Sequence, residues 1–109
     1  MAKYLMIESR DPYEYADANY FYDLASDLAQ RGNELAFFLI QNGVLTTRKA
    51  ARPDKLSELR QAGVTLLADE FSLRERGIRP EAVAEGVHVT EIGTLVDMLV
   101  EDGRKAIWH

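Results

Sequence analysis

The stretch 64-VTLLADEFSLRERGI-78 decides the fold of this chain of 109 residues. It opens with an apolar run that predicts a buried strand, and Asp69 then begins a short helix that closes at Arg76-Gly77. A strand that leads directly into a helix is typical of α/β proteins, which commonly place reactive side chains at the tips of strands. The carboxylate of Asp69 is therefore the first candidate for a functional group.

The segments on either side of this stretch alternate between predicted strands and predicted helices. Apolar runs predict strands over residues 4–7, 35–40, 64–68, 87–89 and 105–109. Amphipathic spacing predicts helices over residues 17–30, 53–63, 69–76 and 90–103, with one helical turn at 80–84. Pro53 is expected to begin its helix, and Thr90 is expected to be an N-cap.

This alternation predicts the fold class. Strands that alternate with helices form a mainly parallel sheet with right-handed crossovers. We therefore predict a single α/β domain over residues 1–109. Its architecture should be a three-layer sandwich, in which a five-stranded, mainly parallel sheet carries helices on both faces.

The composition restricts the classes of partner. Hydrophobic residues make up 47% of the chain and charged residues 28%, which is ordinary for a folded domain and excludes wholesale disorder. The formal charge of −5 argues against binding to nucleic acid or to anionic lipid. No apolar run approaches the roughly 20 residues that span a bilayer. The opening MAKYLMIESR turns polar too early for a secretory signal, so we expect a cytoplasmic protein.

Three polar segments follow the first three predicted strands and define a candidate ligand pocket. In an open parallel sheet, ligands bind at the carboxyl ends of the strands, near the point where the strand order reverses. We therefore predict that the segments converge there. They are Glu8-Ser9-Arg10, Gln41-Asn42-Gly43-Val44 and Asp69-Glu70.

Two roles are open to Asp69. As a helix N-cap it would stabilise its helix by ~1 kcal/mol, and this is the role that we favour. As a functional group it would act as a base or as a phosphate acceptor. Phosphate acceptance resembles the chemistry of receiver domains, where Glu8 and Asp11 would imitate the acidic pair that holds magnesium. The receiver lysine follows the fifth strand, however, whereas Lys105 begins the last predicted strand here, so this chemistry fits poorly.

Other motifs give no cofactor or metal site. Asn42-Gly43 is a lone turn without a GxGxxG or P-loop pattern. His88 and His109 have no acidic or thiol neighbour at ligand spacing, so we interpret His88 as structural and His109 as a chain terminus. A basic cluster is expected to be a solvated helix face; it comprises Arg48, Lys49, Arg52 and Lys55.

Four of the five tyrosines fall within ten residues, namely Tyr13, Tyr15, Tyr20 and Tyr22. Some of them must bury against the sheet, and those that remain exposed favour a protein interface. A tryptophan, Trp108, lies near the end of the chain. We therefore expect part of this surface to be covered in a homo-oligomer.

Several blocks together resemble the DsrE/DsrF-like family, which includes the TusD-type sulfur-relay subunits. The blocks are 37-FFLIQNGV-44, the segment from Leu66 to Ile78 with its Arg76-Gly77-Ile78, the pair Gly86-Val87 and the closing Ala106-Ile107-Trp108. The resemblance covers nearly the whole chain. It implies a DsrE/flavodoxin-like fold and assembly as a trimer or a hexamer, or with a related DsrE-like subunit. It also implies a sulfur-carrier protein as a partner.

The same resemblance implies that the family's sulfur-carrying cysteine falls on Asp69, counting back from Arg76-Gly77. The chain contains no cysteine at all. A persulfide requires a thiolate that can attack sulfur and be attacked at sulfur, and a carboxylate does neither. The family's fold and assembly therefore carry over to this chain, whereas its sulfurtransferase chemistry does not.

Three hypotheses follow from the sequence. The first is a non-catalytic oligomeric scaffold or binding subunit linked to sulfur relay. The second is an enzyme in which Asp69, with Glu8 or Glu70 nearby, performs acid–base chemistry. The third is a sensor that binds a small ligand beside Asn42 and Asp69.

Overall fold

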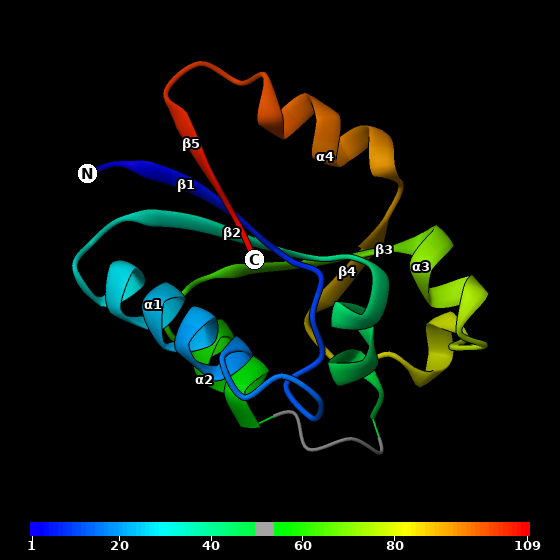
Figure 1. Ribbon diagram of the computed structural model, residues 1–109. Helices are drawn as coiled ribbons and strands as arrows, with labels where there is room; N and C mark the ends of the chain where they lie inside the picture. The colour runs from blue at the N-terminus through cyan, green and yellow to red at the C-terminus, as the bar shows by residue number, and fades with distance from the viewer. Residues whose placement is uncertain (50–53) are drawn as a thin grey trace.

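The computed structural model describes residues 1–49 and 54–109 and contains one five-stranded sheet (Figure 1). All of its strand pairs are parallel, and the strand order is β4-β3-β2-β1-β5. The strands are β1 (Lys3–Glu8), β2 (Glu34–Leu39), β3 (Thr65–Asp69), β4 (Val87–Thr90) and β5 (Arg104–Trp108). The predicted α/β fold with a five-stranded parallel sheet is confirmed.

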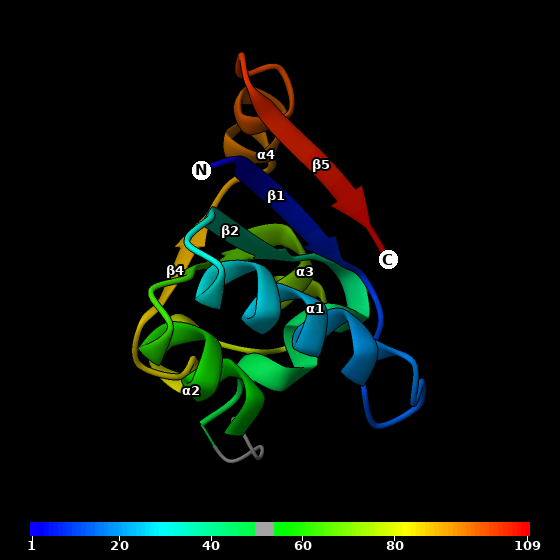
Figure 2. The same ribbon diagram turned by 90° about the vertical axis from the view of Figure 1, so that its left-hand side faces the viewer.

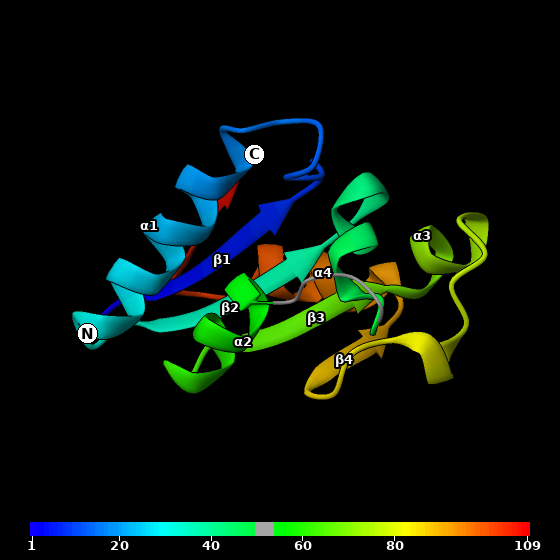
Figure 3. The same ribbon diagram turned by 90° about the horizontal axis from the view of Figure 1, so that it is seen from below.

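Helices cover both faces of the sheet, as the sequence predicts (Figures 2 and 3). One face carries α1 (Ala18–Gln30) and α2 (Asp54–Gln61), and the other carries α4 (Ile92–Leu99). The short α3 (Glu70–Glu75) follows β3 at the carboxyl end of the strands. A 3₁₀ turn, η2 (Pro80–Ala82), lies within the helical turn predicted at 80–84. Within the described residues, no helix has the length and apolar character needed to cross a membrane.

The core forms on both faces because successive strand side chains point in opposite directions. Met6 and Phe37 face α1, where Tyr22 packs on Phe37 with 4.9 Å between the ring centroids. Leu5 and Phe38 point the other way and pack beneath α4. Among the four clustered tyrosines, Tyr22 is buried, whereas Tyr13, Tyr15 and Tyr20 are exposed.

Two predicted helix starts need comment. Thr90 is not the N-cap of α4: the prediction is wrong, because Thr90 pairs in register with Asp69 as the last residue of β4. Its hydroxyl lies 2.7 Å from that of Thr94, and Glu91 takes the cap position without a side-chain hydrogen bond. The predicted start at Pro53 lies outside the described residues, as does Arg52 of the basic cluster.

The segment after β2 is a 3₁₀ helix, η1 (Gln41–Thr47), where the sequence predicted only a turn. Gln41 enters it with a φ of 50°, in the left-handed region. Gly43 follows, and a Cβ atom at this position would overlap the carbonyl oxygen of Glu8. The close approach of η1 to the end of β1 therefore requires glycine at position 43.

Candidate functional site

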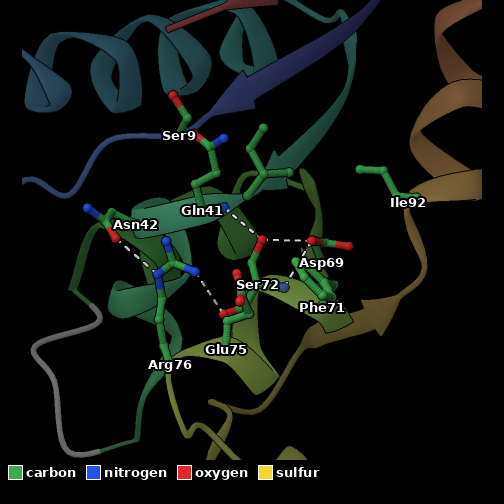
Figure 4. A pocket seen from close by; sticks show the side chains of 10 residues that line it. Ser9, Gln41, Asn42, Asp69, Phe71, Ser72, Glu75, Arg76 and Ile92 are labelled. Atoms are coloured by element: carbon green, nitrogen blue, oxygen red, sulfur yellow. Dashed lines mark hydrogen bonds between the residues drawn. The ribbon is translucent and has the colours of Figure 1, made fainter.

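A cavity of about 480 Å³ lies at the carboxyl end of the sheet (Figure 4). Its walls come from the ends of β1, β2 and β3 and from α3 and the start of α4. Residues predicted from the sequence that line it are Ser9, Gln41, Asn42, Asp69 and Arg76. Residues that the sequence reasoning did not single out are Ile40, Phe71, Ser72, Glu75 and Ile92.

The other predicted site residues lie elsewhere, namely Glu8, Arg10, Gly43, Val44, Glu70 and Gly77. Glu8 is buried, and its side chain points to the face of the sheet that carries α1. The side chain of the preceding strand residue, Ile7, points to the other face. Gly43 and Val44 are buried within η1. Glu70 accepts a hydrogen bond from Arg74 at 3.3 Å on the outer face of α3. The three predicted segments thus meet at one edge of the sheet, but only part of each faces the cavity.

Asp69 ends β3 and caps α3, so the predicted capping role is confirmed. Its Oδ2 accepts hydrogen bonds from the Ser72 backbone N–H at 3.0 Å and from the Ser72 hydroxyl at 2.6 Å. The same hydroxyl accepts a hydrogen bond from the Gln41 N–H at 2.8 Å. The Ser72 hydroxyl therefore donates its hydrogen to Asp69 and accepts one from Gln41. This chain of hydrogen bonds joins the strained Gln41 to the end of β3.

The second carboxylate oxygen of Asp69, Oδ1, has no hydrogen-bond partner among the described residues. The residue is only 4% exposed, so water does not solvate this oxygen freely. Leaving a buried acceptor without a donor costs about 1–3 kcal/mol. Such a group in a folded protein calls for an explanation, and a ligand that donates a hydrogen bond to this oxygen is one.

Arg76 fixes the floor of the cavity. Its Nε donates to Asn42 Oδ1 at 3.0 Å, and its Nη1 donates to the Ser72 carbonyl oxygen at 3.1 Å. In the part of the chain that the structure describes, Arg76 forms no salt bridge with a carboxylate. The arginine of the Arg-Gly motif therefore ties η1 to α3.

A second polar cluster, which the sequence reasoning missed, joins β1 to the residue after β5. His109 Nδ1 lies 3.0 Å from both carboxylate oxygens of Glu8, and Nε2 lies 3.3 Å from Asp17 Oδ2. The ring stacks on Phe21 at 5.2 Å between centroids, and the Ser9 hydroxyl donates to the His109 carbonyl oxygen at 2.9 Å. Interpreting His109 as a mere terminus was wrong, because β5 pairs with β1 and brings residues 101 positions apart into contact.

The Glu8 carboxyl group has a raised pKa. Burial is the main cause, since a charged group loses its hydration in the interior. Hydrogen bonds from the Arg10 N–H and from His109 act in the opposite direction and only partly offset burial. The folded protein therefore favours protonated Glu8 more than the unfolded chain does.

This shift predicts a pH dependence of stability. A raised folded-state pKa contributes stability that is fully present below the unfolded value of 4.5 and is lost as pH rises through the folded value. The variant Glu8→Gln removes this titration. We expect the free energy of unfolding of the native chain, measured in urea relative to Glu8→Gln, to fall as the pH rises above 4.5. A difference that grows with pH would mean that the contacts with Arg10 and His109 outweigh burial.

Comparison with known proteins identifies the family. The sequence pattern of the DsrE/DsrF-like family matches residues 2–108. No curated protein matches the chain.

Several solved structures share the fold. The ychN protein of E. coli superposes with a TM-score of 0.85 at 20% identity, covering 98% of this chain and 100% of that one. MTH1491 of Methanobacterium thermoautotrophicum, a protein of unknown function, gives a TM-score of 0.84 at 20% identity with 100% of both chains covered. BT1422 of Bacteroides thetaiotaomicron, a conserved protein of unknown function, gives 0.78 at 18% identity, covering 98% of this chain and 95% of that one. With a family pattern that spans almost every residue and a fold that agrees with it, this chain belongs to the DsrE/DsrF-like family.

Proposed function

We propose that this chain is a non-catalytic binding subunit, linked to sulfur relay in the cytoplasm, that assembles as a homo-oligomer. The observation that carries the proposal is the buried Asp69, whose Oδ1 lacks a donor among the described residues and which lines a cavity at the end of β3. The resemblance to the family implies that the sulfur-carrying cysteine corresponds to this position. A binding group then stands where a reactive thiol is expected.

The residue types support binding over sulfur transfer. With no cysteine in the sequence, the chain has no thiolate to carry a persulfide. A carboxylate accepts hydrogen bonds and attracts positive charge, which suits recognition. In this proposal the chain keeps the fold of a relay subunit, and the Asp69 carboxylate binds a partner molecule without exchanging sulfur with it.

The geometry also favours binding over acid–base catalysis. An acid–base pair needs a second titratable group within hydrogen-bond reach of the reacting atoms. Glu8 is hydrogen-bonded to Arg10 and His109, and Glu70 to Arg74. Neither of these carboxylates shares a hydrogen bond with Asp69 in the described part of the structure.

The surface of α4 supports the proposed homo-oligomer. We define the α4 face by four large apolar side chains on or next to α4 that are all substantially exposed: Val96, Leu99, Val100 and Trp108. Contiguous exposed apolar patches commonly mark protein interfaces. Asp97 is the single charged residue in the sequence of α4, so two copies can meet here without strong like-charge repulsion despite the net charge of −5. We therefore assign the α4 face to a second copy of this chain, in a trimer or a hexamer, and not to a related DsrE-like subunit or a sulfur-carrier protein.

Non-denaturing mass spectrometry of gently purified protein tests this function. We expect an oligomer that carries a bound small molecule and gains no covalent sulfur from a polysulfide. The variant Asp69→Asn keeps a capping side chain, so its stability should change by less than about 1 kcal/mol. It should retain the oligomer and lose the bound molecule. Monomers with an empty cavity, or stoichiometric covalent sulfur on the native chain, would refute the proposal.

A further inference from the structure

We propose that the Asp69 cavity binds a primary ammonium group, carried by a small organic amine, through a hydrogen bond to Asp69 Oδ1. The inference rests on the proposed binding function and names the class of ligand. It starts from the difference between the two carboxylate oxygens of Asp69: Oδ2 is hydrogen-bonded within the described part of the protein and Oδ1 is not. Oδ2 already accepts two hydrogen bonds from Ser72, so the ligand must supply a donor to Oδ1. In Figure 4, Oδ1 points away from Ser72, toward the side on which Ile92 lies.

The charge around Oδ1 favours a cation. A second cavity of about 370 Å³ is also lined by Asp69, Phe71 and Ile92, so Asp69 faces both spaces. The charged residues that line the two cavities are four carboxylates and two guanidinium groups: Asp69, Glu70, Glu75 and Glu91 against Arg74 and Arg76. The surroundings of Oδ1 therefore carry an excess of negative charge, which attracts positive ligands and repels anions.

Apolar side chains beside the carboxylate favour an amine with a hydrocarbon part. Phe71 is 56% exposed and Ile92 is 51% exposed, and both flank Asp69 in Figure 4. Side chains this exposed change rotamer readily, so they can move aside to admit a ligand and then pack against its alkyl chain. An alkyl ammonium matches both surfaces, because its head donates N–H groups and its tail buries apolar area.

The same contacts argue against a quaternary ammonium. A cation without N–H groups would have to bind through the face of an aromatic ring. The Phe71 ring already has the Arg74 guanidinium 5.8 Å from its centroid. Arg74 is in turn held by Glu70 at 3.3 Å. A quaternary cation would therefore compete with an existing contact and still leave Oδ1 without a donor.

A titration followed by NMR tests the inference with n-butylamine as the probe. For a ligand of this size we expect a Kd on the order of millimolar, with shifts centred on Phe71 and Ile92. Tetramethylammonium and n-butanol are the matched probes: the first has charge without N–H groups, and the second has a donor without charge. Both should bind at least about tenfold more weakly, which corresponds to about 1.4 kcal/mol.

Two variants separate the site from general charge effects. In Asp69→Asn, the side-chain oxygen keeps the contacts with Ser72, so the amide N–H₂ replaces the acceptor at Oδ1. We expect n-butylamine binding to fall at least about tenfold in this variant. The control Asp102→Asn removes the same charge from an exposed turn before β5, at the opposite end of the strands, and should bind like the native chain.

Several outcomes would overturn the inference. Equal binding of tetramethylammonium, or of n-butylamine to Asp69→Asn, would exclude a hydrogen bond to Oδ1. Dissociation of the assembly by Asp69→Asn would mean that a lysine of another copy fills the site in place of a small amine. A bound molecule without an amine, lost in Asp69→Asn, would refute the ammonium but leave the proposed binding function intact. An empty cavity in every preparation would refute both.

Discussion

Gly43→Ala is expected to destabilise the protein by about 3 kcal/mol, the upper end of the cost of forcing extra atoms into a packed interior. The added Cβ atom would overlap the Glu8 carbonyl oxygen and lie 3.0 Å from the Glu8 carbonyl carbon. Both are backbone atoms of β1, which is hydrogen-bonded between β2 and β5 and cannot move aside cheaply. Thermal unfolding should show a decrease in Tm of about 15 °C.

Gly93→Ala is the matched control. Gly93 lies in α4, and a Cβ atom there meets nothing within 4 Å. Alanine in a helix is favoured over glycine, so this variant should be unchanged or more stable by up to about 1 kcal/mol. Equal stability of the two variants would contradict the close approach of η1 to β1. The comparison also tests the site, because Gly43 follows Gln41 and Asn42 in the wall of the cavity.

The second large effect is expected at the α4 face. Val96→Glu places a charge in the centre of the proposed contact between copies, where burying an unpaired carboxylate is strongly unfavourable. Val96 is 52% exposed in the single chain, so the fold itself should tolerate the change. We expect sedimentation of the native chain as a trimer or a hexamer and of Val96→Glu as the 12.3 kDa monomer, with a nearly unchanged Tm of the isolated domain.

Leu24→Glu provides the control for this experiment. Leu24 is 41% exposed on α1, in the layer on the other side of the sheet. The same chemical change at this position should leave the assembly intact. If Leu24→Glu dissociates the oligomer and Val96→Glu does not, copies associate through α1, where Tyr20 is also exposed.

Local patterns predicted most of the fold. The apolar runs that became β1, β2 and β3 are each followed by polar residues, so the runs themselves located these strands within a residue or two. The capping role of Asp69 was also predictable, because aspartate before an amphipathic segment favours that position. Thr90 followed the same rule and failed, since pairing with Asp69 extended β4 by one residue and moved the cap to Glu91.

The missed parts of the site depend on contacts between distant residues. The direction of Glu8 follows from the pleat of β1, and its partner His109 is known only once β5 is placed beside β1. Ser72 lies on a helix that the sequence predicted, but its role required the Gln41 N–H to arrive from the end of β2. Strand order and backbone direction decided these contacts, and neither is encoded in a short pattern.

The position of β5 has a consequence for synthesis of the chain. β1 is a central strand whose second neighbour, residues 104–108, is made about 100 residues later. At the usual rate of about 5–20 residues per second, one edge of β1 stays open for roughly 5–20 seconds during translation. An unpaired strand edge can pair with other nascent chains and lead to aggregation, so protection by molecular chaperones matters most during this interval. Pairing of β5 then closes this edge, and the His109 ring packs on Phe21 and contacts Glu8 beside it.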